Sequence, residues 1–368
     1  PYDRDALTMD AFPMCEACGA EYGRSGDRRR YAQTIACHSC GPYLKALAPE
    51  QAGEKERGFR VRTAAEQGEA LALAVRTLRE GGIVAIKDIG GFHFAICPDN
   101  SGALARLREF KNRERKPFAV MFYGMEQVRH HCALDSREEE LLLSSPRPIV
   151  LLKKRRDFAP GVCMGSDRIG AMLPCNPLQK LLLEELGALV MTSGNRGGEP
   201  IITRDCDMEH LMSQGCPDLM LTHDREILTP LEDSVCQVTR VGVSILRRGR
   251  GHVPEPVWMK RSLPEESFAA GGDMKAVFAF GKKNAAYLGS HFGELTDCRA
   301  LDARNASAVH MAKLLNVRPQ REAVDMHPSY LSGRQALFGS LSVSKIQHHH
   351  AHILSVMAEH GLLGPVLG

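Results

Sequence analysis

The residues best suited to metal chemistry are four cysteines in two matched pairs near the start of the chain. Cys15 and Cys18 form one C-x2-C pair, Cys37 and Cys40 form a second, and eighteen residues separate the two pairs. Each pair can form a knuckle that directs two thiolates at one ion, and two knuckles complete a tetrahedral zinc shell. Because four thiolates leave no coordination position open, the spacing predicts a structural zinc site in a segment too small to fold without it.

A second candidate metal site lies in the histidine-rich stretch "HHHAH" near the end of the chain. His348 and His352 are four residues apart, which places both on one face of a helix, as in the zinc-binding H-E-x-x-H motif. Ile353 and Val356 continue the stretch with helical spacing, so a helix is predicted rather than an unstructured histidine tract. Two imidazoles supply only half of a catalytic shell. A solvated histidine patch is the alternative.

Cations and small polar groups mark a third candidate site, for a nucleotide. "EFKNRERKPFAVMF" places basic residues at the end of a predicted helix, directly before a strand, and "MTSGNRGGEPI" ends a strand in hydroxyl and amide groups. No Walker-type glycine loop occurs, so these two stretches are the candidates for binding triphosphate oxygens and Mg²⁺-bound water. A solvated charged turn is the alternative for the basic run. The candidate residues are Lys111, Arg113, Lys116, Thr192, Ser193 and Asn195.

The elements that must position these residues alternate between helix and strand. Helical spacing from about residue 64 ends at Gly81-Gly82 and leads into the strand "IVAIK" at 83–87. Further strands are predicted at 118–122, 148–152, 188–193 and 243–248, with a helix at 177–186. After a predicted linker at 259–272, a new α/β unit opens with "AVFAFGK", and a helix at about 300–315 and the strand "EAVDMH" follow. Asp325 and His327 close that strand and are interpreted as a turn or cap.

Composition narrows the class of protein. The chain has 368 residues, too many for one ordinary core, and its 47 basic and 44 acidic residues give a net charge of only +3. This balance argues against a broad nucleic-acid-binding surface, and no apolar run is long enough to cross a bilayer. Most of the twelve cysteines stand singly in apolar stretches, which favours a reducing cytoplasm. Both ends, Pro1 and the apolar "GPVLG", are interpreted as cut from a larger protein.

Several motifs together resemble a known family. "KNRERKP", "TSGNRGGEPI", "HDREILTPLEDSV" and "RRGRGHVPEP" look like the YrdC-like domain. The whole series of motifs is similar to HypF-type carbamoyltransferases of [NiFe]-hydrogenase maturation. In that series the YrdC-like motifs follow the two cysteine pairs and "EYGRSGDRRRYAQ", and they precede "YLGSHFGEL", "VDMHPSYLS" and "IQHHHAHILSVMAEHGL". The match covers essentially the whole chain.

The resemblance implies an α/β multidomain protein. A four-cysteine zinc-finger module would occupy residues 1–45, with a linker at 46–63. A YrdC-like nucleotide-binding domain with a mixed twisted sheet would occupy residues 64–258, and after the linker at 259–272 a truncated Kae-type, actin-like domain would occupy residues 273–368.

The resemblance also implies a reaction. The YrdC-like domain would use ATP and Mg²⁺ to convert carbamate, derived from carbamoyl phosphate, into carbamoyl adenylate. The Kae-type domain, with a divalent metal at His348 and His352, would pass the carbamoyl group to the C-terminal cysteine of a HypE-type partner, giving the precursor of the hydrogenase cyanide ligands. Lys87 and His93, at the end of the "IVAIKDIGGFH" strand, would face the small substrate, together with Asp233 and Ser234. As a fragment, this chain is expected to carry out adenylation at most.

Two departures from the family pattern concern the substrate site. The family usually has glycine where this chain has Asp88, and "RxDDSV" where this chain has Pro230, Leu231 and Glu232 before Asp233. The change to Pro230 could weaken a substrate contact, while Glu232 keeps the charge. These departures concern efficiency and specificity rather than reaction type.

Three alternatives remain. Threonylcarbamoyl-adenylate synthesis uses the same domain superfamily but needs neither the cysteine module nor the "HHHAH" domain. Small-molecule O-carbamoyl transfer shares the two later domains and generally lacks the cysteine module. An RNA-binding module could use the cysteine pairs and the run Arg28-Arg29-Arg30, but the near-neutral charge and the lack of a stacking pattern argue against it.

Overall fold

A computed structural model describes residues 3–49 and 64–368, so most of the predicted linker at 46–63 lies outside the described residues. The chain divides into two compact units. Unit 1 comprises residues 1–143, 149–197 and 201–228, and unit 2 comprises residues 144–148, 198–200 and 229–368. Among the described helices, none has the length and apolar character needed to cross a membrane.

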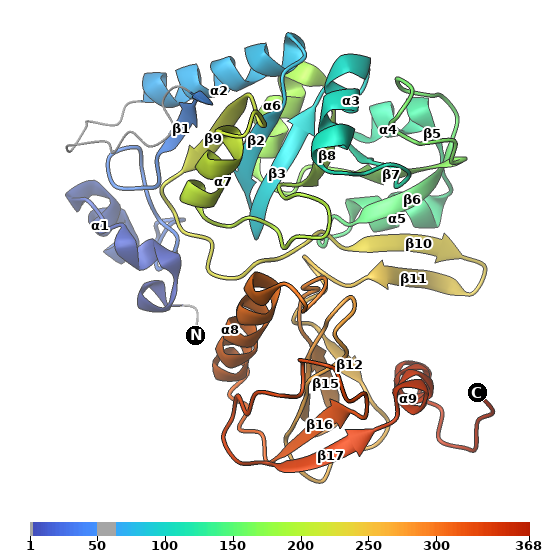
Figure 1. The fold of residues 1–368 in the computed structure, drawn as a ribbon. Coiled ribbons are helices and arrows are strands. Elements are labelled where there is room, and N and C mark those ends of the chain that lie inside the picture. The colour runs from blue at the N-terminus through green and yellow to red at the C-terminus, as the bar shows by residue number, and fades with distance from the viewer. Residues whose placement is uncertain (1–2, 50–63) are drawn as a thin grey trace. The chain divides into compact units, whose positions relative to one another are not determined.

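The cysteine module forms the first part of unit 1. It contains two 3-10 turns, Arg4–Ala6 and Thr8–Ala11, and the helix α1 (Glu16–Gly23). The strand β1 (Leu44–Leu47) follows the second cysteine pair and pairs antiparallel with β9 (Leu219–His223). The module is therefore joined to the edge of the main sheet of unit 1 by backbone hydrogen bonds (Figure 1).

The sheet of unit 1 runs in the order β1-β9-β2-β3-β8-β4-β7-β6, and β5 also pairs with β6. The pairs β2–β9 and β4–β7 are parallel and the others are antiparallel, which confirms the predicted mixed sheet. The remaining strands are β2 (Val84–Asp88), β3 (Gly91–Ile96), β4 (Ala119–Phe122), β5 (Cys132–Ala133), β6 (Ile149–Lys154), β7 (Arg168–Met172) and β8 (Ala188–Ser193).

Helices cover both faces of this sheet. Phe92 and Phe94 of β3 are fully buried in a core with residues of α3 and α7, which lie on one face. The other face carries α6, whose first turn contacts Asp88 at the end of β2. The helices of unit 1 after the module are α2 (Ala64–Arg79), α3 (Ser101–Phe110), α4 (Met125–His131), α5 (Ser136–Leu143), α6 (Pro177–Leu186) and α7 (Asp205–Met212).

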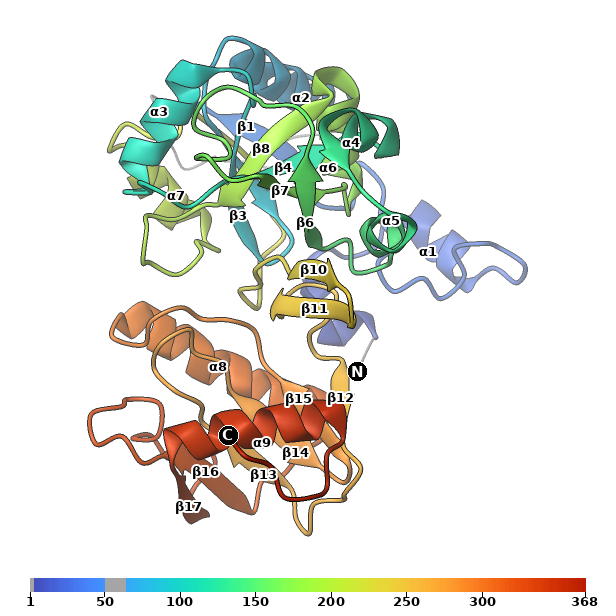
Figure 2. The same ribbon diagram turned by 90° about the vertical axis from the view of Figure 1, so that its right-hand side faces the viewer.

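Unit 2 contains a hairpin and a separate sheet. The hairpin is β10 (Val235–Thr239) and β11 (Gly242–Arg247), and the sheet runs β12-β15-β14-β13-β16-β17. Figures 1 and 2 show the two helices α8 (Cys298–Leu314) and α9 (His348–His360) on opposite faces of that sheet. The strands are β12 (Pro256–Trp258), β13 (Ser267–Ala269), β14 (Ala279–Lys282), β15 (Ala285–Leu288), β16 (Arg321–Asp325) and β17 (Ser342–Ile346).

The core of unit 2 lies between α8 and its sheet. Phe268, Phe278 and Phe280 are fully buried and pack against one another, with ring centroids 5.2 to 6.2 Å apart. Ala308 and Met311 of α8 complete this core. The predicted α/β multidomain fold is thus confirmed, with β13 forming inside the stretch predicted as a linker.

One local prediction is wrong. The stretch "IVAIKDIGGFH" is not one strand but the hairpin β2–β3, in which Ile86 pairs with His93 and Lys87 pairs with Phe92. The chain reverses at Gly90, whose φ of +80° is a conformation that glycine adopts readily. Lys87-Asp88 interrupts the apolar run and Gly90-Gly91 is a turn signal, so the sequence did mark this reversal and the single-strand prediction overlooked it.

Candidate functional site

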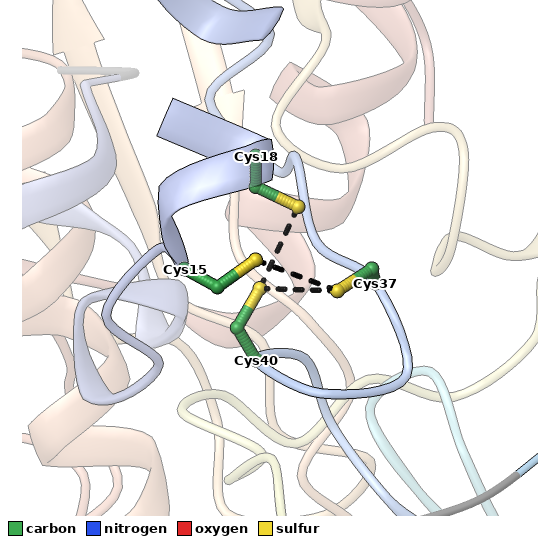
Figure 3. A group of neighbouring side chains, drawn as sticks. All are labelled: Cys15, Cys18, Cys37 and Cys40. Carbon is green, nitrogen blue, oxygen red and sulfur yellow. Dashed lines mark hydrogen bonds between the residues drawn. The ribbon is translucent and has the colours of Figure 1, made fainter. Parts of the chain in front are cut away.

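The four cysteines converge on one point in the cysteine module (Figure 3). The Cys15–Cys37 and Cys37–Cys40 sulfur atoms are 3.7 Å apart, and those of Cys18 and Cys40 are 3.6 Å apart. A tetrahedron with zinc–sulfur bonds of about 2.3 Å has edges of about 3.8 Å. The sulfur positions therefore fit a four-thiolate zinc ion closely.

Backbone geometry holds the second knuckle in place. The Gly41 N–H donates to the Cys37 carbonyl at 2.8 Å, and a Cβ at Gly41 would lie 2.9 Å from that oxygen and 2.7 Å from Ala36 Cβ. The backbone N–H groups of Ser39 and Cys40 lower the pKa of Cys37 to about 6, although burial opposes this. Burial and the neighbouring thiols raise the pKa of Cys18 to about 12, so without a metal ion the cluster would hold protons that zinc must displace.

Arg29, from the arginine run, contributes to this module structurally. Its guanidinium donates to the Ala36 carbonyl at 2.9 Å, lies 3.9 Å from the Cys18 sulfur, and forms an ion pair of 2.9 Å with Glu21. Part of the run considered for RNA binding is therefore engaged within the module itself.

The nucleotide-site residues meet at the end of β8 in unit 1. Lys111 is 3% exposed and its Nζ donates to Ser193 O and Asn195 O, both at 2.6 Å, and to Asn195 Oδ1 at 3.1 Å. The Gly197 N–H donates to Lys111 O at 3.1 Å, and a Cβ at Gly197 would lie only 2.4 Å from that oxygen. The structure thus brings Lys111 and the turn after β8 together, as predicted, with the ammonium directed into the turn.

Arg113 joins the same group from the other side. Its Nη1 donates to Thr192 Oγ1 at 3.0 Å, its Nε donates to Lys116 O at 3.1 Å, and its guanidinium lies 4.5 Å from the centre of the Phe118 ring. The Lys116 side chain is exposed. Ser193 Oγ donates to Asn195 Oδ1 at 2.6 Å. Five of the six candidate residues therefore lie around one turn, while Lys116 is linked to them through its backbone carbonyl. A phosphate oxygen reaching Lys111 would replace one of its present acceptors.

Lys87 and His93, which were predicted to face one substrate, lie on opposite faces of the sheet. Cross-strand partners share a face and neighbours along a strand alternate, so His93 shares a face with Ile86 and not with Lys87. Lys87 Nζ lies 2.8 Å from Asp205 Oδ1 and donates to His223 O at 2.8 Å. Nothing in the sequence pattern pointed to Asp205 as its partner.

Asp88 anchors a buried network on the His93 face. Its carboxylate accepts hydrogen bonds from the Ile89 N–H at 2.7 Å, from Asn176 Nδ2 at 2.6 Å and from Gln179 Nε2. Asn176 also caps α6 by accepting the Gln179 N–H, and Asp88 Oδ2 lies 3.9 Å from His93 Nδ1. The residue that departs from the family pattern is therefore bound at the N-terminus of a helix, where negative charge is favoured.

We expect Asp88→Ala to lower the free energy of unfolding of unit 1 by about 1–3 kcal/mol, because two buried amide donors lose their acceptor. Urea unfolding followed by circular dichroism measures this, with Asp99→Ala, at an exposed position beyond the other end of β3, as the control. Equal stability of the two variants would contradict a structural role for Asp88.

Asp233 and Ser234 pair with the segment Gly249-Arg250 within unit 2. Ser234 is fully buried, and its Oγ donates to Arg250 O at 3.0 Å and accepts the Gly249 N–H at 2.9 Å. Asp233 Oδ1 lies 2.9 Å from Arg250, and Glu232 forms an ion pair with Arg247. These contacts join "EDSV" to "RRGRG", and the Ser234 hydroxyl is used to hold the two segments together.

The histidine pair lies at the start of α9. His348 Nε2 and His352 Nε2 are 3.2 Å apart, so the predicted convergence of the two imidazoles is present. Asp325, which was interpreted as a turn or cap, places Oδ2 2.6 Å from His348 Nδ1. Burial raises the pKa of Asp325, but the hydrogen bonds from His348 and from the His327 N–H outweigh it and the pKa is lowered overall.

Comparisons with known proteins match each part of the chain to a described family. A HypF finger model matches residues 14–47, a model described as telomere recombination, of the Sua5, YciO and YrdC type, matches residues 76–249, and a HypF Kae1-like domain model matches residues 262–359. The three matches follow the order in which the cysteine pairs, the strand-end turn and the histidine pair occur.

Other relatives match this chain along almost its whole length. A carbamoyltransferase HypF from Synechocystis is 38% identical over 98% of this chain and 52% of its own length, and one from Rhodobacter capsulatus is 38% identical over 98% of this chain and 47% of its own. A crystal structure of full-length HypF in a phosphate- and nucleotide-bound form superposes with a TM-score of 0.88 at 39% identity, over 98% of this chain and 46% of that one. The chain thus spans about half the length of the relatives it matches.

Proposed function

Because this chain belongs to the HypF carbamoyltransferase family, we propose that its YrdC-like part converts carbamate and ATP into carbamoyl adenylate and pyrophosphate. The observation that carries the proposal is the ordered match of finger, YrdC-like and Kae1-like parts along one chain, together with the group of cations and small polar residues at the end of β8. A carbamate oxygen would attack the α-phosphorus of ATP, and the bond to pyrophosphate would break.

The residues proposed to bind ATP are those around the turn after β8. Adenylation places negative charge on the α-phosphate and on the leaving pyrophosphate, so fixed donors and cations stabilise the transition state. Lys111 and Arg113 would supply the positive charge, and the exposed Lys116 would reach the outer phosphates. Thr192, Ser193 and Asn195 would supply oxygen and amide groups. Mg²⁺ would offset part of the phosphate charge when bound. His93, beside the anchored Asp88, is the proposed contact for carbamate.

For the Kae1-like part we propose transfer of the carbamoyl group to the C-terminal cysteine of a HypE-type partner, with a divalent metal ion at His348 and His352. The thiolate sulfur would attack the carbamoyl carbon, and AMP would leave. That this chain alone stops at adenylation stays a prediction. Carbamoylation of a HypE-type protein by this chain alone, detected by mass spectrometry of the partner, would contradict it.

ATP–pyrophosphate exchange tests the adenylation proposal. With ammonium carbamate as the substrate, radiolabelled pyrophosphate is expected to enter ATP, because formation of the acyl adenylate is reversible. Threonine with bicarbonate is the comparison substrate, since it is what a threonylcarbamoyl-adenylate synthase would use. Exchange with threonine and bicarbonate but none with carbamate would overturn the proposal in favour of that alternative.

A further inference from the structure

The Asp325 carboxylate uses its two oxygens for two different partners. Oδ1 accepts the backbone N–H of His327 at 2.8 Å, which is the turn expected at the end of a strand. Oδ2 lies 2.6 Å from Nδ1 of His348, 23 residues further along the chain. The Asp325 side chain is only 9% exposed. The turn accounts for one oxygen, and the short contact of the other with the first residue of α9 needs a separate explanation.

The contact determines which nitrogen of His348 is free to bind a cation. An ionised carboxylate only accepts hydrogen bonds, so Nδ1 of His348 carries a proton, and in the neutral ring Nε2 then presents the lone pair. That Nε2 is 3.2 Å from Nε2 of His352. Two nitrogens that each bind one tetrahedral ion at about 2.05 Å lie about 3.3 Å apart. Without an ion the two atoms share a hydrogen bond, and their spacing also fits a shared ion.

We propose that Asp325 is a positioning residue that holds His348 in the Nδ1–H tautomer, so that Nε2 of His348 and Nε2 of His352 bind a divalent cation together. The proposal rests on the proposed function only in placing that cation in the Kae1-like part. Carboxylates that orient a metal-binding histidine in this way commonly change metal affinity by about 10–100-fold when they are removed.

Because each carboxylate oxygen of Asp325 has its own partner, Asp325→Asn is a sharp test. The His327 N–H requires an acceptor, so it holds the amide oxygen of the variant in the Oδ1 position. The amide nitrogen then faces Nδ1 of His348 as a donor. Nδ1 must accept, the proton moves to Nε2, and the lone pair needed for the cation is lost. Side-chain size and the turn are both preserved, so only the hydrogen-bonding direction changes.

Two measurements on the complete 368-residue chain test the proposal. Long-range proton–nitrogen correlation spectra of histidine-labelled, metal-free protein report the tautomer, with His348→Gln identifying the resonance. Titration with Co²⁺, after the cysteine module has been filled with zinc, reports binding at the pair, with His352→Gln showing complete loss. Asp302→Asn, at an exposed position on α8, is the matched control.

We expect Asp325→Asn to move the His348 proton from Nδ1 to Nε2 and to weaken Co²⁺ binding by about 10–100-fold, while Asp302→Asn changes neither. An unchanged tautomer in Asp325→Asn, Co²⁺ affinity within twofold of the parent chain, or no Co²⁺ binding at the pair in the parent chain would each overturn the proposal. ATP–pyrophosphate exchange is measured in parallel. Its absence, with the Co²⁺ and tautomer effects intact, would count against adenylation and leave the role of Asp325 standing.

Discussion

Cys37→Ser is expected to release zinc and to unfold the cysteine module. A hydroxyl does not replace a thiolate in this shell, and binding of structural zinc contributes about 10–16 kcal/mol in isolated zinc fingers. The module has a small apolar interior, in which Met9, Phe12 and Ile35 are buried, so it lacks a core that could compensate for the ion. The number of zinc ions that the four cysteines bind, measured by mass spectrometry, should fall from one per chain to none.

The effect should extend to the edge of the sheet, because β1 follows the module directly and pairs with β9 from Leu44–His223 to Leu47–Met220. Hydrogen exchange should quicken in both strands of Cys37→Ser. Cys206→Ser, at an exposed cysteine outside the module, should leave zinc and exchange unchanged. Acid should imitate the substitution, since protons compete with zinc for the thiolates and binding weakens as pH falls. A Cys37→Ser chain that keeps its zinc and its protected β1 would refute a structural four-thiolate site.

Features set by residues close together in the sequence were the predictable ones. The two knuckles need only three-residue spacing, and the helix at 177–186 begins and ends where its asparagine cap and Gly187 place it. The order of strands was beyond reach, because β9 inserts between β1 and β2 although it follows β8 in the chain. Such non-local pairing decides which side chains share a face. The separation of Lys87 from His93 is a local feature instead, because the register of the β2–β3 hairpin and the unrecognised turn at Gly90 set it.

Asp325 shows the same limit at a single residue. The expectation of a turn was correct for Oδ1, because the His327 N–H lies two positions away. The partner of Oδ2 reaches it only after β17 has paired in parallel with β16, which brings the start of α9 back to the end of β16. Asp88 is comparable, since its amide partners on α6 lie 88 and 91 positions away. In both cases the residue type was informative, but the contact depended on the fold.

Lys111→Met is expected to reduce ATP–pyrophosphate exchange by about 10²–10³-fold, the effect of removing one well-placed donor from a site of developing charge. Methionine keeps the length and most of the apolar stem, so the change removes the ammonium with little change in volume. Ser193 O and Asn195 O lose their donor, and the turn after β8 loses the contacts that hold it against the end of α3. Charge and turn geometry are therefore lost together.

The matched control is Arg115→Ala, which removes a cation from the same basic run at an exposed position. It should change exchange by no more than about twofold at moderate salt, because exposed charges are screened. Separating KM for ATP from kcat distinguishes the two roles of Lys111. A rise in KM alone would indicate that the ammonium binds ground-state ATP, whereas a fall in kcat would indicate a contact made in the transition state. If a folded Lys111→Met chain exchanged pyrophosphate as fast as Arg115→Ala, Lys111 would have no role at the nucleotide site. Its contacts would then serve only to hold the turn after β8.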